Sequence, residues 1–315
     1  MSLINILKYF YQSLHPEVRF FLRNYGVTFL AKKILVLIKF GFLKKITLDN
    51  GLILSLVNDH DYELRANYLS DILANNFETQ KINIIKEVLC PGDKFIDVGC
   101  SFGLFSLIAS EIVGTNGEVL AFDPSETAIK TLNVNSQING FKNIKTFNTA
   151  LGNSDKLVNF FGQNYGGTII KGNPQYETSM GQKVEMKKLD SIFSSRDLEN
   201  LKFIKIDAEG AEFEIIKGAE NILKNSKNLI VSLELGEKML TSSGTSIEEV
   251  IITLMSMGYR NFVDITNNDK IIEINSSNFM KDLQIGKFGS FFNPQVGFFC
   301  EIIASKNRQF KEIAI

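Results

Sequence analysis

The stretch Phe95-Ile96-Asp97-Val98-Gly99-Cys100-Ser101-Phe102-Gly103 decides the fold. Its first four residues form a short run typical of a buried strand, and the run stops at a loop with two glycines. The residues that follow, Leu104–Ile112, predict a helix. Glycine lets a backbone turn tightly and approach a ligand, and a helix start favours bound anions. The stretch therefore predicts a strand, a ligand-binding loop and a helix.

This loop lacks the two common phosphate-binding patterns. It has no third glycine at the G-x-G-x-x-G spacing, and no Lys-Ser/Thr pair follows Gly103. A ligand without phosphates fits better, and S-adenosylmethionine (SAM) is one, with an amino acid end, a ribose and an adenine. Asp97 can face its ammonium group, and the loop amides can face its carboxylate. A purely structural turn is the plainer interpretation, and the loop alone does not decide between the two.

Strands and helices alternate along the rest of this region. Such alternation predicts βαβ units and a mostly parallel sheet with right-handed crossovers. Residues 152–190 interrupt it with a polar, Gly-rich stretch, which we expect to be an inserted hairpin or loop. The expected strands are 95–98, 118–122, 144–149, 201–206, 229–233, 261–265 and a last strand over 296–305 that suits an antiparallel edge; the expected helices are 104–112, 126–137, 211–223 and 247–257.

Candidate cofactor residues follow the second and third strands. In a sheet of this kind, ligands bind outside the carboxyl ends of the strands. Asp123 follows the second strand and can accept both ribose hydroxyls, although Asp123 or Ser125 can also simply cap the next helix. A small residue after the third strand, such as Ala150, leaves room for a flat adenine.

Carboxylates gather after the fourth and fifth strands. Asp207 and Glu209 lie in Asp207-Ala208-Glu209-Gly210, and Glu234 ends the fifth strand. Neighbouring strands lie about 4.8 Å apart, so Asp207 and Glu234 face one pocket if these two strands pair. Such carboxylates can act as a base, hold a substrate hydroxyl or bind a divalent metal. We favour a base over a metal; the plainer interpretation is a helix start that favours acids.

An ordered set of motifs across residues 75–235 resembles the FkbM-type SAM-dependent methyltransferases. The most specific piece is Ile204-Lys205-Ile206-Asp207-Ala208-Glu209-Gly210-Ala211-Glu212. The other pieces are Pro91-Gly92-Asp93, the Asp97–Gly103 loop, Phe122-Asp123-Pro124, Ala150-Leu151-Gly152-Asn153, Leu189-Asp190, Lys217-Gly218-Ala219 and the strand carrying Glu234. The chain departs from the family at Cys100-Ser101, where Ala-Asn is usual, and at Asp123, which replaces a common Glu.

The resemblance implies an α/β, Rossmann-like class I SAM-dependent methyltransferase fold. We expect a seven-stranded, mostly parallel sheet with one antiparallel strand and helices on both faces, plus an N-terminal helical and β-hairpin extension. It also implies O-methylation of a hydroxyl on a sugar, a glycan or a related small molecule. The expected catalytic residues are Asp207, Glu209 and Glu234, and the expected cofactor contacts are Glu78, Asp97, Gly99, Cys100, Ser101, Gly103, Asp123, Pro124, Thr149, Ala150 and Asp207.

Composition fits a globular enzyme. Of 315 residues, 44% are hydrophobic and 22% are charged, which excludes a disordered chain. The net charge of −1 argues against a protein that binds nucleic acid with its whole surface. The three cysteines, Cys90, Cys100 and Cys300, lack metal-type spacing and suit a reducing cytosol. We read Cys100 as a small loop filler rather than a nucleophile.

The N-terminal segment carries an unusual charge. Residues 1–45 hold eight Lys/Arg and one acid, so they carry +7 while the other 270 residues carry −8. Two interpretations stay open: a helical pair packed on the main domain, or contact with an anionic membrane or a lipid-linked substrate. The longest apolar run, Ile34–Ile38, is far too short to span a membrane, and no secretory signal is recognisable. We expect an extension over 1–75, containing a hairpin around Asp49-Asn50-Gly51, and a methyltransferase domain over 76–315.

The sequence also bears on three rival functions. Methylation of nucleobase amino groups is disfavoured because Asp207-Ala208-Glu209-Gly210 stands where such enzymes carry Asn/Asp-Pro-Pro-aromatic. A nicotinamide-dependent enzyme is disfavoured by the missing third glycine. A non-catalytic SAM-binding module, attached to a membrane or to a partner protein, stays open, as do lipid-linked and protein acceptors. We expect a cytoplasmic protein, with peripheral attachment at the inner face of the membrane as an option.

Overall fold

The computed structural model describes residues 45–48, 50–55, 78–163, 166–176, 180–266, 272–274, 291–293 and 297–308. The chain divides into two compact units, residues 1–46 with 57–77, and residues 47–56 with 78–315. The expectation for the basic segment 1–44 lies outside the described residues. So does the first part of the helix predicted over residues 60–90, whose described part contains a helix over Thr79–Val88. The expected boundary after residue 75 stays a prediction.

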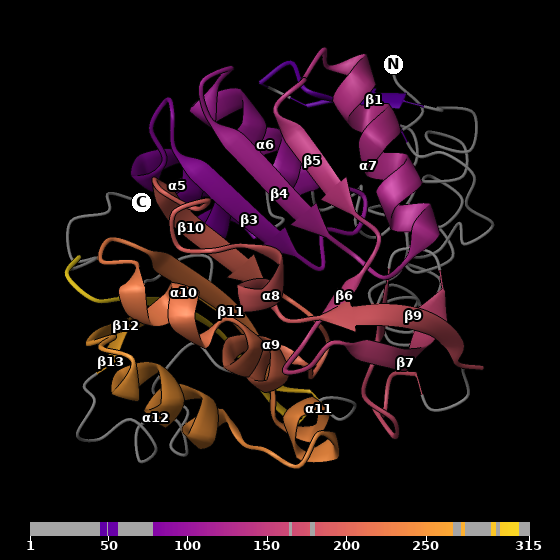
Figure 1. Cartoon of the computed structure of the whole chain (residues 1–315), viewed down its shortest axis with the longest axis vertical. Helices are drawn as coiled ribbons and strands as arrows, with labels where there is room; N and C mark the ends of the chain where they lie inside the picture. Colours follow the sequence, from indigo (N-terminus) through magenta and orange to yellow (C-terminus); the bar gives the residue numbers. More distant parts are fainter. Residues whose placement is uncertain are drawn as a thin grey trace, which may run out of the picture. The chain divides into compact units, whose positions relative to one another are not determined.

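A mostly parallel sheet forms the centre of the second unit (Figure 1). Within the described residues it has nine strands, and its path runs β13-β12-β15-β11-β10-β3-β4-β5, with β14 paired to β15. Seven of them form the expected sheet, and short β13 and β14 add to it. The strands are β3 (Lys94–Val98), β4 (Glu118–Phe122), β5 (Ile144–Phe147), β10 (Leu201–Ile206), β11 (Ile230–Gly236), β12 (Asn261–Asp264), β13 (Ile272–Ile274), β14 (Phe291–Asn293) and β15 (Gly297–Ser305).

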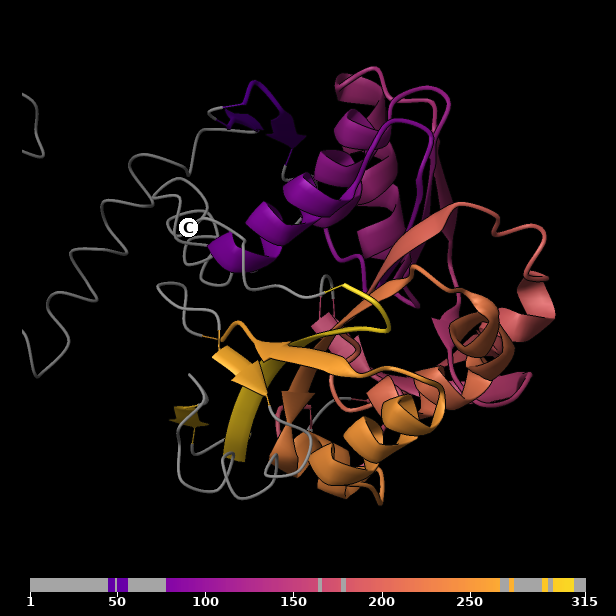
Figure 2. The same ribbon diagram turned by 90° about the vertical axis from the view of Figure 1, so that its left-hand side faces the viewer.

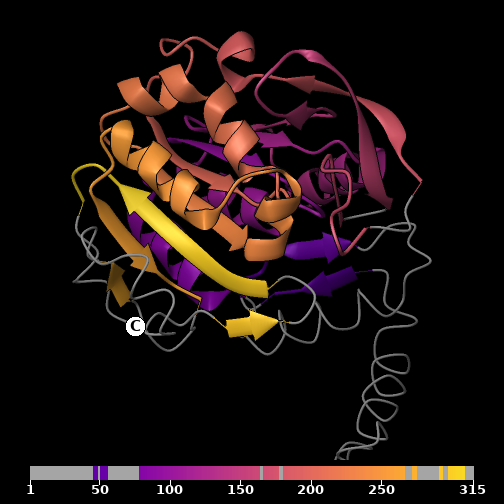
Figure 3. The same ribbon diagram turned by 90° about the horizontal axis from the view of Figure 1, so that it is seen from below.

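Strand direction confirms the expected class. Strands β5, β4, β3, β10 and β11 pair in parallel, and β15, yellow in Figure 3, runs antiparallel between β11 and β12. The inner strands are mostly apolar because helices cover both faces of the sheet, as is usual for parallel strands, and Asp97, Lys205 and Glu234 lie near their carboxyl ends. The third strand is shorter than predicted: it ends at Phe147, and Ala150 begins another strand.

Helices α5 and α6 cover one face of this sheet, and α9, α10 and α12 cover the other (Figures 1 and 2). Ser125 and Ser246 cap α7 and α12, since their hydroxyls accept the amides of Ala128 and Glu249. None of the helices in the described part of the chain has the length and apolar character to cross a bilayer. The bounds are α5 (Thr79–Val88), α6 (Leu104–Val113), α7 (Glu126–Ile138), α8 (Leu189–Ile192), α9 (Glu212–Gly218), α10 (Glu220–Asn225), α11 (Glu237–Ser242) and α12 (Ile247–Ser256).

The single helix predicted over 211–223 is wrong, because the chain breaks between α9 and α10. A β-carbon at Gly218 would lie 1.8 Å from the carbonyl oxygen of Gly152, so α9 ends against the loop after β6. Asp190 then accepts the amides of Asn221 and Ile222 and caps the start of α10. A close backbone contact and a distant cap, both tertiary features, therefore divide the helix.

The expected insertion is a hairpin in a second, smaller sheet. Strands β7 (Lys156–Gln163) and β9 (Gln182–Lys187) pair antiparallel, and β9 also pairs with β6 (Ala150–Leu151). Strand β8 (Gly166–Thr168) extends the sheet beside β7. This arrangement places the loop between β8 and β9 within reach of the main sheet's carboxyl edge.

The predicted N-terminal hairpin is confirmed as a two-stranded sheet of β1 (Lys45–Thr47) and β2 (Ile53–Ser55). Strand β2 docks on α7, because the amides of Ile53 and Ser55 donate to the side-chain oxygens of Asn139 (2.8 Å) and Asn135 (2.6 Å). Residues 47–56 consequently belong to the same compact unit as residues 78–315.

Candidate functional site

Polar side chains share one face of the sheet at its carboxyl edge. Lys205 of β10 pairs with Asp97 of β3 on one side and with Ser232 of β11 on the other. Glu234 stands two residues beyond Ser232 and therefore points to the same face, opposite Glu301 of β15. Helices α5 and α6 lie on this face. The register thus brings charged groups from four adjacent strands together.

The loop after β3 is held tightly within the protein. Gly99 and Gly103 adopt positive φ angles of 73° and 93°, which favour glycine. A β-carbon at Gly99 would lie 1.8 Å from the carbonyl oxygen of Asp207, so this loop touches the turn after β10. Ser101 also has a positive φ, 52°, and its amide donates to Asp123. The expected loop therefore forms where predicted.

Most of the loop amides, however, do not face outward as predicted. Those of Gly99 and Cys100 donate to the carbonyl of Phe122, and that of Gly103 donates to the carbonyl of Cys100. The start of α6 has no side-chain cap. The amide end of this helix, rather than the loop, is consequently the local donor suited to a carboxylate.

Asp97 is fully buried. Its Oδ2 accepts the Ser106 hydroxyl at 2.6 Å, and its Oδ1 lies 3.4 Å from the ammonium of Lys205. Burial raises the pKa of Asp97, while Lys205 and Ser106 oppose that shift. Cys100 is buried too, and burial holds the pKa of its thiol well above the ordinary value. A thiol that stays protonated is a poor nucleophile, which agrees with its interpretation as a loop filler.

Asp123 joins the ends of β4 and the first loop. Its two oxygens accept the amides of Ser101 (3.0 Å) and Ser125 (2.8 Å), and each can accept one more donor. Burial raises the pKa of Asp123 to about 6, although the hydrogen bonds from these two backbone amides lower it. The helix cap itself is Ser125, not Asp123. Spare acceptor capacity at the carboxyl end of β4 fits a ribose diol, and the ribose role stays a prediction.

The predicted adenine residues border the insertion. Thr149 donates its hydroxyl to the carbonyl of Glu185 in β9 at 2.9 Å, and Ala150 pairs with Met186. The carbonyl of Pro124 accepts the side-chain amide of Asn148 at 3.0 Å. These contacts make the insertion part of the same edge, while direct contacts of Thr149, Ala150 and Pro124 with a cofactor stay predictions.

The turn after β10 carries two of the predicted catalytic carboxylates. Asp207 is about a quarter exposed, and its Oδ2 lies 3.1 Å from the Lys205 ammonium. Glu209 is half-buried in a left-handed conformation, with φ 52°. Burial, helped by the charges of Asp207 and Glu212, raises the pKa of Glu209 to about 8. The turn therefore presents one carboxylate paired with a cation and one whose proton affinity lies near neutral pH.

Two neighbours outside the predicted set hold this turn. Glu212 is buried, and its Oε1 accepts the amides of Ala208 (2.9 Å) and Gly210 (3.2 Å). Asn173, from the loop of the insertion, donates to the backbone carbonyl of Glu209 at 2.7 Å. The insertion is thus bonded directly to the residue whose pKa lies near neutrality.

A family model decides the classification. The model described as Methyltransferase FkbM domain matches residues 97–261, slightly more than half of the chain. The chain belongs to the FkbM methyltransferase family. The resemblance seen in the motifs is confirmed, and with it the enzyme class and SAM as cofactor.

Single relatives of this FkbM methyltransferase are distant. The ribosomal protein L11 methyltransferase of Caldanaerobacter subterraneus subsp. tengcongensis is 33% identical over 88 residues. That match covers 27% of this chain and 26% of the relative, so the chain spans only about a quarter of that protein. Among solved structures, a putative rRNA-methylase from Clostridium thermocellum is 12% identical, with a TM-score of 0.42 over 73% of this chain and 96% of that chain. A geranyl diphosphate methyltransferase in complex with SAM is 11% identical, with a TM-score of 0.42 over 84% and 97%.

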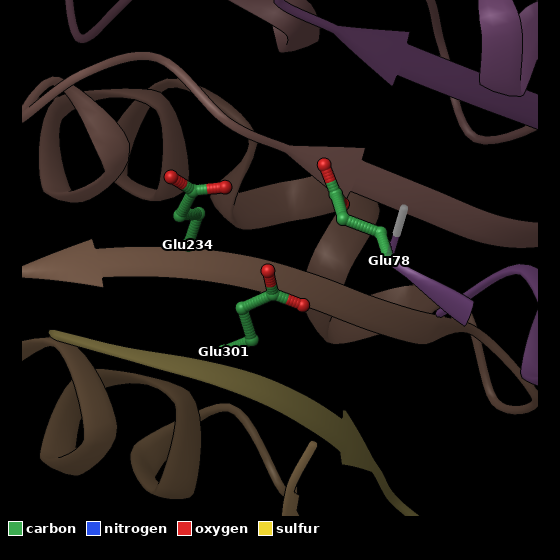
Figure 4. A group of neighbouring side chains, drawn as sticks. All are labelled: Glu78, Glu234 and Glu301. Carbon is green, nitrogen blue, oxygen red and sulfur yellow. The ribbon is translucent and has the colours of Figure 1, made fainter. Parts of the chain in front are cut away.

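The FkbM methyltransferase also gathers three glutamates, Glu78, Glu234 and Glu301 (Figure 4). One carboxylate oxygen from each lies within 4.8 Å of the others. The ammonium of buried Lys81 forms an ion pair with Glu78 and lies 3.5 Å from Glu301. Burial raises the pKa of Glu234 well above the ordinary value, and burial raises that of Glu301 to about 7. The chain itself supplies a cation to this group.

The carboxylates of the disfavoured metal alternative are not the group that the structure assembles. Asp207, Glu209 and Glu234 were the expected alternative, whereas the described residues bring Glu234 together with Glu78 and Glu301. Glu78, expected at the cofactor, lies in this group. Glu234 remains linked to the turn after β10, since the charge of Asp207 is the next largest cause of its raised pKa after burial.

Sequence reasoning missed Lys205, Lys81, Glu301 and Glu212. Lys205 had a usable signal, because a residue two positions before Asp207 on a strand shares its face. Lys81 had a weaker one, as it stands three residues after Glu78 at the start of a helix. Glu301 had none, since its position depends on the antiparallel pairing of β15 with β11.

Proposed function

We propose that this FkbM methyltransferase transfers the methyl group of SAM to a hydroxyl of a sugar, a glycan or a related small molecule, with Glu209 as the general base. The observation that carries the proposal is the Glu209 carboxyl, held half-buried on the turn after β10 with its pKa raised to about 8. An alcohol must lose its proton as its oxygen attacks. A base is most effective when its pKa lies near the working pH.

The residues at the carboxyl edge fit SAM in two respects. The start of α6 has no side-chain cap, and Asp123 retains acceptor capacity. In this scheme α6 holds the amino acid carboxylate and Asp123 holds the ribose. SAM supplies an electrophilic methyl group on a sulfonium. The task of the chain is to align the acceptor with it and to take the acceptor's proton.

Asp207 and Glu209 have different tasks in this proposal. Asp207 is paired with Lys205 at 3.1 Å, and its charge raises the pKa of Glu209. Glu209 in its ionised form accepts the hydroxyl proton, while the acceptor oxygen forms its bond to the methyl carbon and the bond from that carbon to sulfur breaks. The Tyr176 hydroxyl donates a hydrogen bond to Glu209 Oε1 at 3.5 Å and stabilises the ionised carboxylate.

The acidic character of the turn supports a neutral acceptor over nucleic acid. Asp207 presents a carboxylate that is about a quarter exposed at this edge, and a carboxylate disfavours a phosphate beside it. Asn173 of the insertion donates a hydrogen bond to the backbone of Glu209, so the insertion lies where it can line a pocket for a small acceptor. A lipid-linked glycan would also give the basic segment 1–45 a role at a membrane surface.

Methyl transfer from isotopically labelled SAM into a fractionated cell extract tests the acceptor class. Label in the glycan, small-molecule or lipid-linked fraction is the expected result. Label confined to protein or nucleic acid would overturn the acceptor class. With the labelled fraction as substrate, Glu209→Gln is expected to lower kcat/KM by about 10²–10⁴-fold. Glu214→Gln, a matched change on the following helix, is the control, and equal rates for the two variants would remove Glu209 from the base role.

A further inference from the structure

Lys205 connects the loop after β3, residues 99–103, to the turn that bears Asp207; we call residues 99–103 the cofactor loop. Its ammonium donates to the carbonyl of Gly99 at 3.0 Å and lies 3.1 Å from Asp207 Oδ2 and 3.4 Å from Asp97 Oδ1. We propose that Lys205 is a positioning residue that fixes the cofactor loop and the Asp207 turn in one geometry. The part concerning Asp207 rests on the proposed function, and the part concerning SAM affinity does not.

The surroundings of Lys205 leave it no room for a direct ligand contact. Its side chain is about 3% exposed, its ammonium donates to the Gly99 carbonyl, and the carboxylates of Asp97 and Asp207 form ion pairs with it. The ring of Phe105, on α6, lies 5.3 Å from the ammonium. A buried lysine enclosed by protein groups in this way acts through those groups, which is why we assign it a positioning role.

The charge of Lys205 is as important as its reach. Burial lowers its pKa, and the carboxylates of Asp207 and Asp97 more than offset this effect, so the pKa is raised. From α5, Lys81 opposes that shift and Glu78 adds to it. Without the ammonium, two carboxylates from adjacent strands would lie close together with no cation between them. Such repulsion would push the turn away from the loop.

The two turns touch so closely that one cannot move alone. The β-carbon position of Gly99 is filled by the carbonyl oxygen of Asp207, and the amide of Asp207 donates to the carbonyl of Val98 at 3.1 Å. A displaced Asp207 turn therefore displaces the loop that leads into α6. The expected signature is a loss of SAM affinity from a residue that does not touch SAM.

The first experiment measures SAM affinity by calorimetry in Lys205→Ala, with Lys202→Ala on the same strand as control. Loss of a charged hydrogen-bonding group predicts roughly 10- to 100-fold weaker binding for the first variant and unchanged binding for the second. Propylammonium matches the deleted atoms and should restore affinity, whereas tetramethylammonium, which has no N–H donor, should not. Unchanged affinity in Lys205→Ala, or a loss that propylammonium does not restore, would overturn the proposal.

A second variant, Lys205→Gln, removes the charge and keeps a hydrogen-bond donor on a slightly shorter side chain. It keeps the proposal testable if Lys205→Ala does not fold. Lys205 lowers the pKa of Glu209, so the rise of kcat/KM with pH should move to higher pH in this variant. An unmoved pH profile would overturn the link to the Asp207 turn. The binding measurements need no acceptor, so their result stands apart from any failure of the hydroxyl-acceptor proposal.

Discussion

The close contact at Gly99 makes a sharp prediction for Gly99→Ala. Its matched control is Gly140→Ala, because both glycines have φ 73° but a β-carbon at Gly140 would meet nothing within 4 Å. Alanine at either position takes on the left-handed conformation, at a cost of roughly 1–2 kcal/mol. Only at Gly99 does the new methyl group also collide with backbone.

The size of that collision follows from the geometry. The methyl carbon would lie 1.8 Å from the carbonyl oxygen of Asp207, so the two turns must separate by about 1.6 Å to reach the 3.4 Å of ordinary contact. Overpacking of this kind costs about 1–3 kcal/mol beyond the conformational term. A misplacement of about 1 Å at a reacting centre can lower a rate by roughly 100-fold.

Two measurements check this prediction. Urea unfolding should show that Gly99→Ala loses more stability than Gly140→Ala by about 1–3 kcal/mol. Calorimetry should show weaker SAM binding for Gly99→Ala and unchanged binding for Gly140→Ala. If the two variants lose equal stability and bind SAM equally well, the contact between the first loop and the Asp207 turn does not matter for the site, and the reasoning fails.

Three further predictions address the charged groups. Burial raises the pKa of Glu212 from 4.5 to about 7. The protonated carboxyl therefore stabilises the fold at low pH, and this contribution, up to about 3 kcal/mol, is lost as pH rises toward 7. Glu212→Gln should make the free energy of unfolding in urea depend less steeply on pH, and an unaltered pH dependence would contradict the assignment. Tyr176→Phe should move the rise of kcat/KM with pH to higher pH, because the Tyr176 hydrogen bond lowers the pKa of Glu209; a shift to lower pH would be the wrong sign. Dialysis against EDTA should leave methyl transfer unchanged, because Lys81 already supplies a cation to the group of Glu78, Glu234 and Glu301; activity that is lost and then restored by Mg²⁺ would refute this.

The strands of the methyltransferase domain could be predicted from sequence because each is a short apolar run ending at a polar turn. Strands 118–122 and 201–206 match the structure at both ends. The helix over 211–223 could not be predicted correctly, because its break depends on the carbonyl of Gly152 and on the cap from Asp190. Both partners lie far away in sequence, so local periodicity carries no trace of them.

The carboxylates of the candidate site could be predicted, but their partners could not. Asp207, Glu209 and Glu234 follow strand ends, and that placement is visible in sequence. The pKa values of Glu209 and Glu234 depend on burial and on charged groups that tertiary structure brings close, among them Lys205 and Lys81. Lys81 comes from a helix that precedes the first strand of the main sheet, and no pattern around Asp207 points to it. Hence sequence identified the groups, and structure separates Asp207, which is paired with Lys205, from Glu209, whose pKa burial raises to about 8.

Many of the motifs that identify the family serve to hold the site together. Gly218 packs on Gly152, Asp190 caps α10, and Glu212 accepts two amides of the turn after β10. These contacts fix the geometry of the cofactor edge whatever the acceptor is, so a family match specifies the methyl donor better than the methyl acceptor. Acceptor choice must then come from residues that approach the turn from outside the motifs. In the described part of the chain, Asn173 and Tyr176 of the insertion bond to Glu209, which makes the insertion the place to look for that choice.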